Sequence, residues 1–308
     1  MYHFIVNPNS RCGQSARIWK RLERQLDHDS VDYEVYLTGG PGEATDIAKQ
    51  LTEGCKEPLV IVAVGGDGTV NEIVDGLSFS SPVTLGLIPT GSGNDLARSL
   101  RLPRSPRRCL KKILHPKYHK LVDYGVMTYG DDQMKHRRFM VSTGIGLDAA
   151  VCHNLMHSKA KHIFNHLHIG GLSYIVIGCK QLFLAKPSKG YILLDGVKKI
   201  EFNHIYFISA HIHPYEGGGF KFAPEADGSD GKLEICVVSH QSKRKLLPIM
   251  ANALTAKHKR FKGLRCYACQ EVLIHTERPM AVHADGESCF CQQELIIQCI
   301  QKKIRVIV

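Results

Sequence analysis

The stretch Val64-Gly65-Gly66-Asp67-Gly68-Thr69-Val70-Asn71-Glu72 decides the fold of this chain. It follows an apolar run, residues 59–64, that is typical of a strand buried on both faces. The apolar residues after it recur at helical spacing, at Val70, Ile73, Val74 and Leu77. Glycines in a strand-to-helix turn let backbone N–H groups approach phosphate oxygens, and the helix N-terminus favours the negative charge. A plain turn does not need the aspartate among the glycines, so the stretch predicts a phosphate-binding loop.

Strands and helices alternate on both sides of this loop. We expect strands over residues 2–6, 31–37, 59–64 and 83–88. Apolar side chains at helical spacing lie between them, at Ile18, Trp19, Leu22 and Leu26 and at Ala44, Ile47, Ala48 and Leu51. The order predicts an α/β domain over residues 1–122, with a mostly parallel sheet covered by helices on both faces.

The pattern changes near Lys120, where strand signals follow one another between turn signals such as Asp195-Gly196 and Asp230-Gly231. One helical stretch, residues 153–184, interrupts them. The expected strands are residues 120–128, 138–142, 190–194, 199–209, 232–239, 265–273, 280–284, 294–300 and 304–308. They predict an antiparallel β-sandwich over residues 123–295, and a ligand between this domain and the first.

A second loop, Pro89-Thr90-Gly91-Ser92-Gly93-Asn94-Asp95, follows the next predicted strand and precedes a helix. Two loops at neighbouring strand ends suit a nucleotide held from both sides at the carboxyl edge of the sheet.

Together the two loops resemble a superfamily that includes NAD kinases, phosphofructokinases and the diacylglycerol, sphingosine and ceramide kinases, and the second loop has the lipid-kinase form. Further matches cover the whole chain. They are Asn7-Pro8-Asn9-Ser10, Thr38, Asp123, Thr143-Gly144-Ile145-Gly146-Leu147-Asp148, residues 223–233 and His283-Ala284-Asp285-Gly286-Glu287. The chain is most similar to the bacterial soluble diacylglycerol kinases.

This resemblance implies an α/β nucleotide domain plus a β-sandwich, with the segment 296–308 returning to the first domain. It also implies that ATP is contacted by residues of both loops and of the first two strand ends. These are Asn7, Pro8, Asn9, Ser10, Thr38, Gly65, Gly66, Asp67, Gly68, Thr69, Val70, Asn71 and Ser92.

Two Mg²⁺ sites are implied by the same resemblance. Asp67, Asp95 and Asp123 are expected around the catalytic ion through water, which agrees with the preference of Mg²⁺ for water and few carboxylates. The backbone carbonyls of Asp227 and Lys232 and the carboxylate of Asp230 are expected to bind a second, structural ion; a plain Asp-Gly turn is the alternative.

Phosphoryl transfer also needs a carboxylate that accepts the proton of the attacking hydroxyl. In bacterial relatives the base lies at the position of Asp285 or Glu287, and Asp285 is favoured here. In sphingosine-type relatives it lies at the position of Asp67.

The expected function is therefore an ATP-dependent lipid kinase of phospholipid biosynthesis that converts diacylglycerol to phosphatidic acid. Sphingoid bases, ceramide, phosphatidylglycerol and polyprenol are alternative acceptors. An NAD-kinase-like enzyme and a non-catalytic nucleotide-binding protein are the competing classes of function.

Charge and hydropathy bear on the partners. The net charge is +11, with basic clusters at residues 101–112, 243–245 and 257–262. Such a surface favours binding to anionic lipid head groups. Nucleic acid is not an expected partner, because the basic clusters are not accompanied by the signature of a nucleic-acid recognition helix. No apolar run is long enough to span a bilayer and no signal peptide is apparent, so we expect a cytoplasmic protein at the membrane surface. The sequence allows a homodimer but does not determine the oligomeric state.

Two segments are candidates for lipid contact. The apolar stripe Leu246, Leu247, Ile249, Met250, Ala253 and Leu254 fits a surface-binding helix, or a helix packed in the core. The uncharged stretch 163–179 is a candidate acyl-chain entrance.

The 11 cysteines favour reduced thiols over a disulfide framework in a chain expected inside the cell. Cys266-x-x-Cys269 and Cys289-x-Cys291 are a weaker candidate for zinc, and His211 and His213 alternate on one expected strand face.

Overall fold

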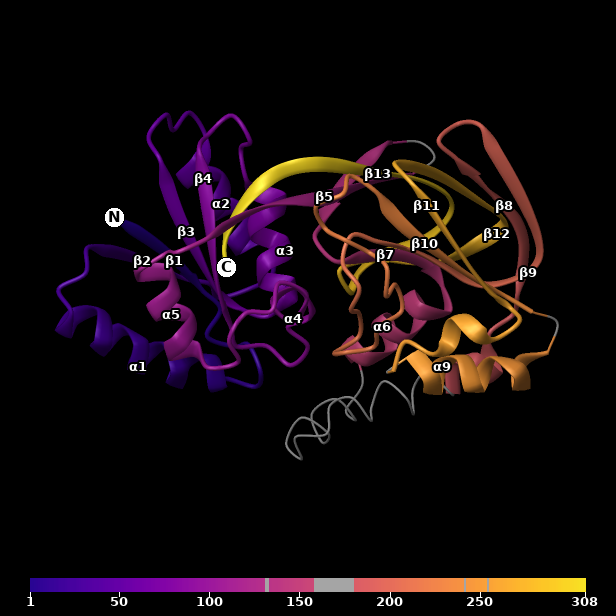
Figure 1. Cartoon of the computed structure of the whole chain (residues 1–308), viewed down its shortest axis with the longest axis horizontal. Coiled ribbons are helices and arrows are strands. Elements are labelled where there is room, and N and C mark those ends of the chain that lie inside the picture. Colours follow the sequence, from indigo (N-terminus) through magenta and orange to yellow (C-terminus); the bar gives the residue numbers. More distant parts are fainter. Residues whose placement is uncertain (131–132, 158–179, 241, 254) are drawn as a thin grey trace. The chain divides into compact units, whose positions relative to one another are not determined.

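The computed structural model describes residues 1–130, 133–157, 180–240, 242–253 and 255–308. The chain divides into two compact units, one made of Met1–Val122 and Lys302–Val308 and the other of Asp123–Gln301. Both chain ends belong to the first unit (Figure 1).

The first unit is built on a parallel sheet in the order β2-β1-β3-β4, to which the end of β13 adds a further parallel strand. The bounds are β1 Tyr2–Val6, β2 Tyr33–Leu37, β3 Leu59–Gly65 and β4 Val83–Pro89. Residues 61–64 of β3 are all buried, because helices cover both faces of the sheet.

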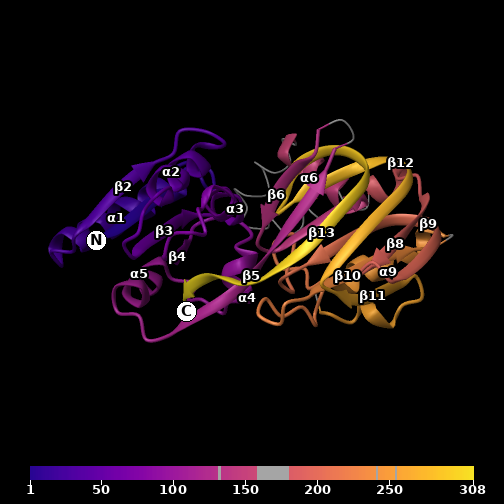
Figure 2. The same ribbon diagram turned by 90° about the horizontal axis from the view of Figure 1, so that it is seen from above.

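The helices of this unit pack in two pairs, α1 with α5 and α2 with α3. Figure 2 shows the unit from a second direction. Their bounds are α1 Gln14–His28, α2 Glu43–Thr52, α3 Asp67–Gly76, α4 Asp95–Ser99 and α5 Pro106–Leu114. Trp19 and Leu22 of α1 and Leu110 of α5 form one apolar cluster with Val62 and Val64 of β3. The predicted α/β domain is confirmed.

The second unit is an antiparallel assembly in the order β11-β10-β9-β7-β12-β13, with β8 pairing β9 and β12 and β5 pairing β6 and β13. The bounds are β5 His119–Tyr129, β6 Lys135–Phe139, β7 Ser142–Gly146, β8 Ser188–Leu194, β9 Lys198–His211, β10 Leu233–Ser239, β11 Leu264–Cys269, β12 Glu271–Ala284 and β13 Glu287–Ile307. Its apolar core takes side chains from nearly all these strands, which confirms the predicted β-sandwich domain.

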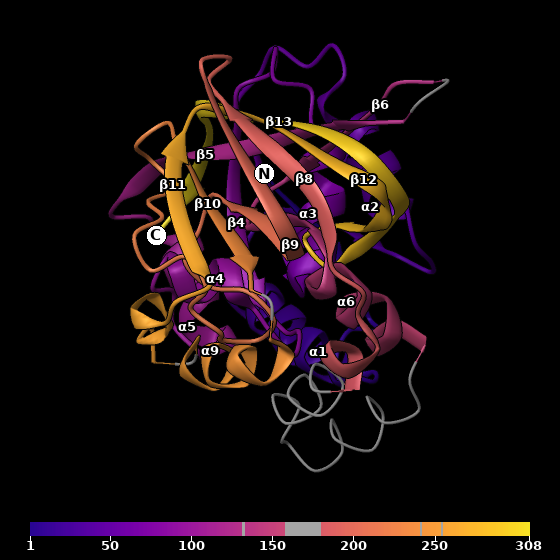
Figure 3. The ribbon, with the colours of Figure 1, turned by 90° about the vertical axis from the view of Figure 1, so that its right-hand side faces the viewer.

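Helices α6 (Leu147–His157) and α9 (Leu247–Ala253) lie on the same side of these strands (Figure 3), together with the short helices η1 (Lys243–Leu246) and η2 (His258–Arg260). Leu246 and Ile249 are 1 % exposed and belong to an apolar cluster beneath β9 and β10. Of the two interpretations of this stripe, the burial of Leu246 and Ile249 supports a helix packed in the core. The candidate acyl-chain entrance, residues 163–179, lies outside the described residues. Among the helices that the structure describes, none is long and apolar enough to cross a membrane.

Several predicted strand bounds were wrong. The strand expected at residues 138–142 is two strands, β6 and β7, because the N–H groups of Met140 and Val141 bond to a carboxylate instead of a neighbouring strand. The strand expected at residues 265–273 is divided between β11 and β12, and the last two expected strands are one strand, β13.

Candidate active site

The two predicted phosphate loops touch each other backbone to backbone. The N–H of Thr90 donates to the carbonyl of Gly65 over 2.8 Å. A Cβ atom added to Gly91 would lie 2.5 Å from the Cα of Gly66, and one added to Gly66 would lie 3.2 Å from the Cα of Gly91. The first distance excludes a side chain at Gly91 and the second leaves little room for one at Gly66, so glycine at these positions lets the loops pack together.

Substitution of Gly91 with alanine is expected to separate the loops. Overpacking of this kind costs about 1–3 kcal/mol, and we expect nucleotide affinity to fall about tenfold or more. Calorimetric titration with ATP and thermal unfolding of the variant measure both effects. The control is Gly40→Ala, where the new Cβ would meet only the Glu43 carboxylate at 3.7 Å. Equal affinity of the two variants would contradict the packing argument.

The Asp67 carboxylate links the loops at a second point. Its oxygens accept hydrogen bonds from the N–H groups of Asp95 (3.0 Å) and Leu96 (3.1 Å) at the start of α4. Burial raises the pKa of Asp67, while those N–H groups and the nearby Arg98 oppose the rise. The Asp95 carboxylate in turn binds the Arg98 guanidinium at 2.6 Å and is 5 % exposed.

The remaining residues predicted to contact ATP gather at one edge of the parallel sheet. Asn7 follows β1, Thr38 follows β2, and the two loops follow β3 and β4. The Asn7 amide donates to the Thr69 hydroxyl over 3.1 Å, which ties the segment after β1 to the glycine loop. Thr38 is buried, whereas Ser92 is exposed. A small pocket lies at this edge, lined by Gly65, Gly66, Asp67 and Asn94 among others.

In the second unit, Asp285 and Gly286 form the two-residue turn between β12 and β13, with φ of 47° and 87°. Both residues in the left-handed region are typical of a type I′ hairpin turn. The Asp285 carboxylate accepts hydrogen bonds from the N–H groups of Met140 (2.7 Å), Val141 (2.8 Å) and Ser142 (3.0 Å). The turn is thereby anchored between β6 and β7, with both carboxylate oxygens engaged.

Glu287 opens β13 directly after this turn and pairs with Ala284. Its side chain is half-buried, and no described residue donates a hydrogen bond to its carboxylate. Asp285, the acid favoured as the base from the sequence, therefore has its oxygens occupied by the backbone, whereas the alternative acid Glu287 has lone pairs available.

Sequence reasoning missed a buried ionic cluster beside this turn. His283 Nε2 lies 3.3 Å from Glu216 Oε1 and 3.4 Å from Asp148 Oδ2, and Glu216 Oε2 lies 3.5 Å from His211 Nε2. Gly144 makes room for the cluster, since a Cβ there would lie 2.0 Å from Asp148 Oδ2. The signals available were Asp148 at the end of a matched motif and the alternation of His211 with His213; nothing singled out Glu216.

Burial and neighbouring charged groups shift the pKa values in this cluster in opposite directions. Burial raises the pKa of Asp148 and lowers that of His211. Against the burial penalty, Cys152 and the carboxylates of Asp148 and Glu216 raise the pKa of His283 well above its usual value. The N–H of Gly286, however, donates to His283 Nδ1 over 3.1 Å and requires that nitrogen to be unprotonated. The hydrogen bond between His283 and the turn of Asp285 and Gly286 therefore forms only when His283 Nδ1 carries no proton.

The residues predicted to surround Mg²⁺ fall into both units. Asp67 and Asp95 lie together in the first unit. Asp123 belongs to the second, where its carboxylate accepts the N–H of Gly231 over 2.8 Å and its N–H donates to Gly228. Carboxylates already engaged by N–H groups suit contact with Mg²⁺ through water rather than direct ligation.

The loop expected to bind a structural Mg²⁺ has the geometry of a tight turn. The Asp227 carboxylate accepts the hydroxyl of Ser229 over 2.7 Å, and the Asp230 carboxylate accepts the N–H of Lys232 over 2.9 Å. The loop offers only oxygen ligands, which suit a hard cation such as Mg²⁺. The structural Mg²⁺ site stays a prediction.

The four-cysteine zinc candidate does not form. Cys269 and Cys289 are buried in the core of the second unit, while Cys291 is exposed. Cys266 instead faces Cys236 of β10. Within the described ranges, the groups close enough to share an ion are Asp148, Glu216 and His283, and Glu234, Cys236 and Cys266.

Comparisons with known proteins agree with this architecture. Residues 1–126 match the diacylglycerol kinase catalytic domain, and residues 141–308 match the YegS C-terminal NAD kinase beta sandwich-like domain. A Bacillus subtilis protein, YtlR, which carries the provisional name of lipid kinase, is 27% identical over 290 residues, covering 93% of each chain. A diacylglycerol kinase of Mycobacterium tuberculosis is 27% identical over 285 residues, covering 92% of this chain and 87% of its own.

Among solved structures, one from Bacillus anthracis, provisionally named a diacylglycerol kinase, superposes with a TM-score of 0.76 at 23% identity. It covers 99% of this chain and 96% of its own. Yeast NADH kinase superposes with a TM-score of 0.54 at 10% identity, covering 99% of this chain and 82% of its own. At these identities the superpositions show the fold alone.

Proposed function

Since the chain belongs to the lipid kinase family that joins a diacylglycerol kinase catalytic domain to a YegS-type β-sandwich, we propose that it transfers the γ-phosphate of ATP to the hydroxyl of diacylglycerol. Relatives named diacylglycerol kinase, at about 25% identity, support this choice of acceptor. The observation that supports phosphoryl transfer from ATP is the convergence of the segment after β1 and both glycine loops at one edge of the parallel sheet.

In this proposal the first unit binds ATP. Backbone N–H groups of the touching glycine loops hold the phosphates, and the N-terminus of α3 adds favourable charge. Mg²⁺, when bound, neutralises phosphate charge in the transition state. Asp67, Asp95 and Asp123 are the residues that would hold the ion through water, and Asp67 also links the two glycine loops.

The second unit supplies the base. We assign that role to Glu287, whose carboxylate is available, and a holding role to Asp285, whose carboxylate is not. Glu287 accepts the proton of the lipid hydroxyl as the hydroxyl oxygen attacks the γ-phosphorus, and the bond from the γ-phosphorus to the departing ADP breaks. The lipid is taken from the membrane surface, where the basic clusters bind anionic head groups.

A lipid screen tests the acceptor. Purified protein with labelled ATP and Mg²⁺ is offered diacylglycerol, sphingoid base, ceramide, phosphatidylglycerol and polyprenol in micelles with and without anionic lipid, and NAD in solution. We expect phosphorylation of diacylglycerol and stimulation by anionic lipid. Turnover of NAD alone would replace the proposal with an NAD-kinase-like one, and ATP binding without any turnover would leave a nucleotide sensor.

Glu287→Gln is expected to lower the turnover number about a hundredfold or more with an unchanged melting temperature, since a general base contributes about 10²–10⁴ in rate. The control is Glu294→Gln, an exposed glutamate on the same strand. If Glu287→Gln keeps wild-type turnover, the base is elsewhere and Asp67 becomes the next candidate.

A further inference from the structure

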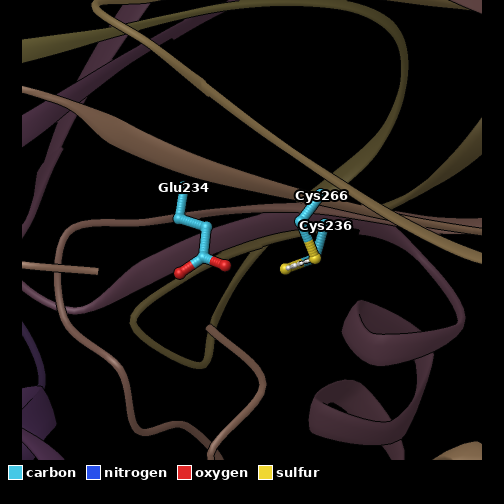
Figure 4. Close-up of side chains that lie close together, drawn as sticks. All are labelled: Glu234, Cys236 and Cys266. Atoms are coloured by element: carbon cyan, nitrogen blue, oxygen red, sulfur yellow. Dashed lines mark hydrogen bonds between the residues drawn. The ribbon is translucent and has the colours of Figure 1, made fainter. Parts of the chain in front are cut away.

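Two thiols and a carboxylate converge on one face of the second unit. Cys236 of β10 and Cys266 of β11 are directly opposite in the antiparallel register, and their sulfur atoms lie 3.6 Å apart. Glu234 is two residues before Cys236, so it points to the same face of the sheet. Its carboxylate and both sulfur atoms lie within 4.8 Å of one another. Figure 4 shows the three side chains on the same side of the strands.

Glu234 is unusual in its surroundings. The strand that carries it, Leu-Glu-Ile-Cys-Val-Val-Ser, is otherwise almost wholly apolar, and the Glu234 side chain is only 6 % exposed. Taking a carboxylate out of water is costly unless charge or hydrogen bonds compensate it. One of its oxygens accepts the N–H of Glu225 over 2.9 Å. A cation bound beside the carboxylate would add a further favourable charge contact.

The spacing of the thiols suits a tetrahedral metal ion. Two zinc–sulfur bonds of about 2.3 Å at a tetrahedral angle place the sulfur atoms about 3.8 Å apart. The observed 3.6 Å needs a change of only a few tenths of an ångström. A disulfide, with sulfur atoms about 2.05 Å apart, would need a much larger change in the distance between the two sulfur atoms.

We propose that Glu234, Cys236 and Cys266 bind one divalent cation of the Zn²⁺ class, as a site separate from the proposed kinase chemistry. A surface pocket is lined by Glu234 and Cys266 among others, and it supplies both an entry path and room for water as the fourth ligand. The ion fastens β10 to β11.

Thiolate ligands decide which metal binds. Asp227 and Asp230 line the same pocket but offer only oxygen, which Mg²⁺ prefers. Cysteine sulfur selects zinc and its heavier analogue cadmium over Mg²⁺. Both thiols must lose their protons on binding, so about two protons leave per ion and the affinity rises with pH.

Cadmium titration of the whole reduced chain tests the site, because cadmium–thiolate bonds absorb in the ultraviolet. We expect a saturable absorbance at one Cd²⁺ per chain that Zn²⁺ displaces and excess Mg²⁺ does not. The titration is repeated with Cys236→Ser, Cys266→Ser, Glu234→Gln and, as the control, the exposed thiol variant Cys291→Ser. Circular dichroism of each variant shows whether it is folded.

We expect either cysteine variant to lose the absorbance, Glu234→Gln to weaken binding about tenfold or more, and Cys291→Ser to bind as the wild type does. Cys266 is only partly buried, so its variant tests the site even if Cys236→Ser does not fold. The proposal is overturned if the wild type shows no saturable absorbance, if folded Cys266→Ser retains it, or if Mg²⁺ displaces the cadmium.

Discussion

Asp285→Ala is expected to lower the stability of the second unit by about 3–5 kcal/mol, because it removes three hydrogen bonds to a charged acceptor and leaves three backbone N–H groups without it. For a unit of this size, the melting temperature should fall by about 10 °C. Thermal unfolding followed by circular dichroism measures the change. Lipid phosphorylation should disappear in the same variant, because the turn positions Glu287.

The chain offers a matched control in Asp195, which forms the same kind of Asp-Gly turn between β8 and β9. Its φ is 49°, and its carboxylate accepts the N–H groups of Gln270 (2.8 Å) and Glu271 (2.9 Å). Asp195→Ala therefore puts alanine into the same strained conformation but should keep lipid phosphorylation. An Asp285→Ala protein that melts like the wild type but is inactive would instead make Asp285 the base.

Asp67→Asn is expected to reduce turnover about a hundredfold, equivalent to about 2.7 kcal/mol of transition-state stabilisation. Asparagine keeps one acceptor oxygen but turns an NH₂ group toward the N–H of either Asp95 or Leu96, so the link between the loops is broken. It also removes a negative charge near the proposed Mg²⁺. The measurements are the turnover number at saturating ATP and the melting temperature.

Asp75→Asn, near the other end of the same helix, is the control for loss of one charge from α3. It should leave turnover unchanged. Activity of Asp67→Asn within a few-fold of the wild type would remove Asp67 from the proposed site. Loss of activity together with normal ATP binding would point to the metal or to proton transfer rather than to loop packing.

The local elements of the first unit were predictable because each has a local cause. The buried run 59–64 and the glycines after it define a strand and a turn without reference to the rest of the chain. In the second unit the Asp-Gly turns were equally visible. The break between β6 and β7 was not, because its cause is the carboxylate of Asp285, more than a hundred residues away in sequence.

The sequence by itself determined the α/β and β-sandwich classes and the two glycine-rich loops that follow β3 and β4. These follow from the periodicity of apolar side chains and from the φ values that glycine and aspartate tolerate. Only the tertiary structure decided what the acids contact. Asp67 bonds the second loop, Asp285 holds three N–H groups, Asp148 and Glu216 flank His283, and Cys266 faces Cys236 rather than Cys269. Charge and hydrogen-bond partners are chosen by strand register and chain packing, which place residues distant in sequence within a few ångströms.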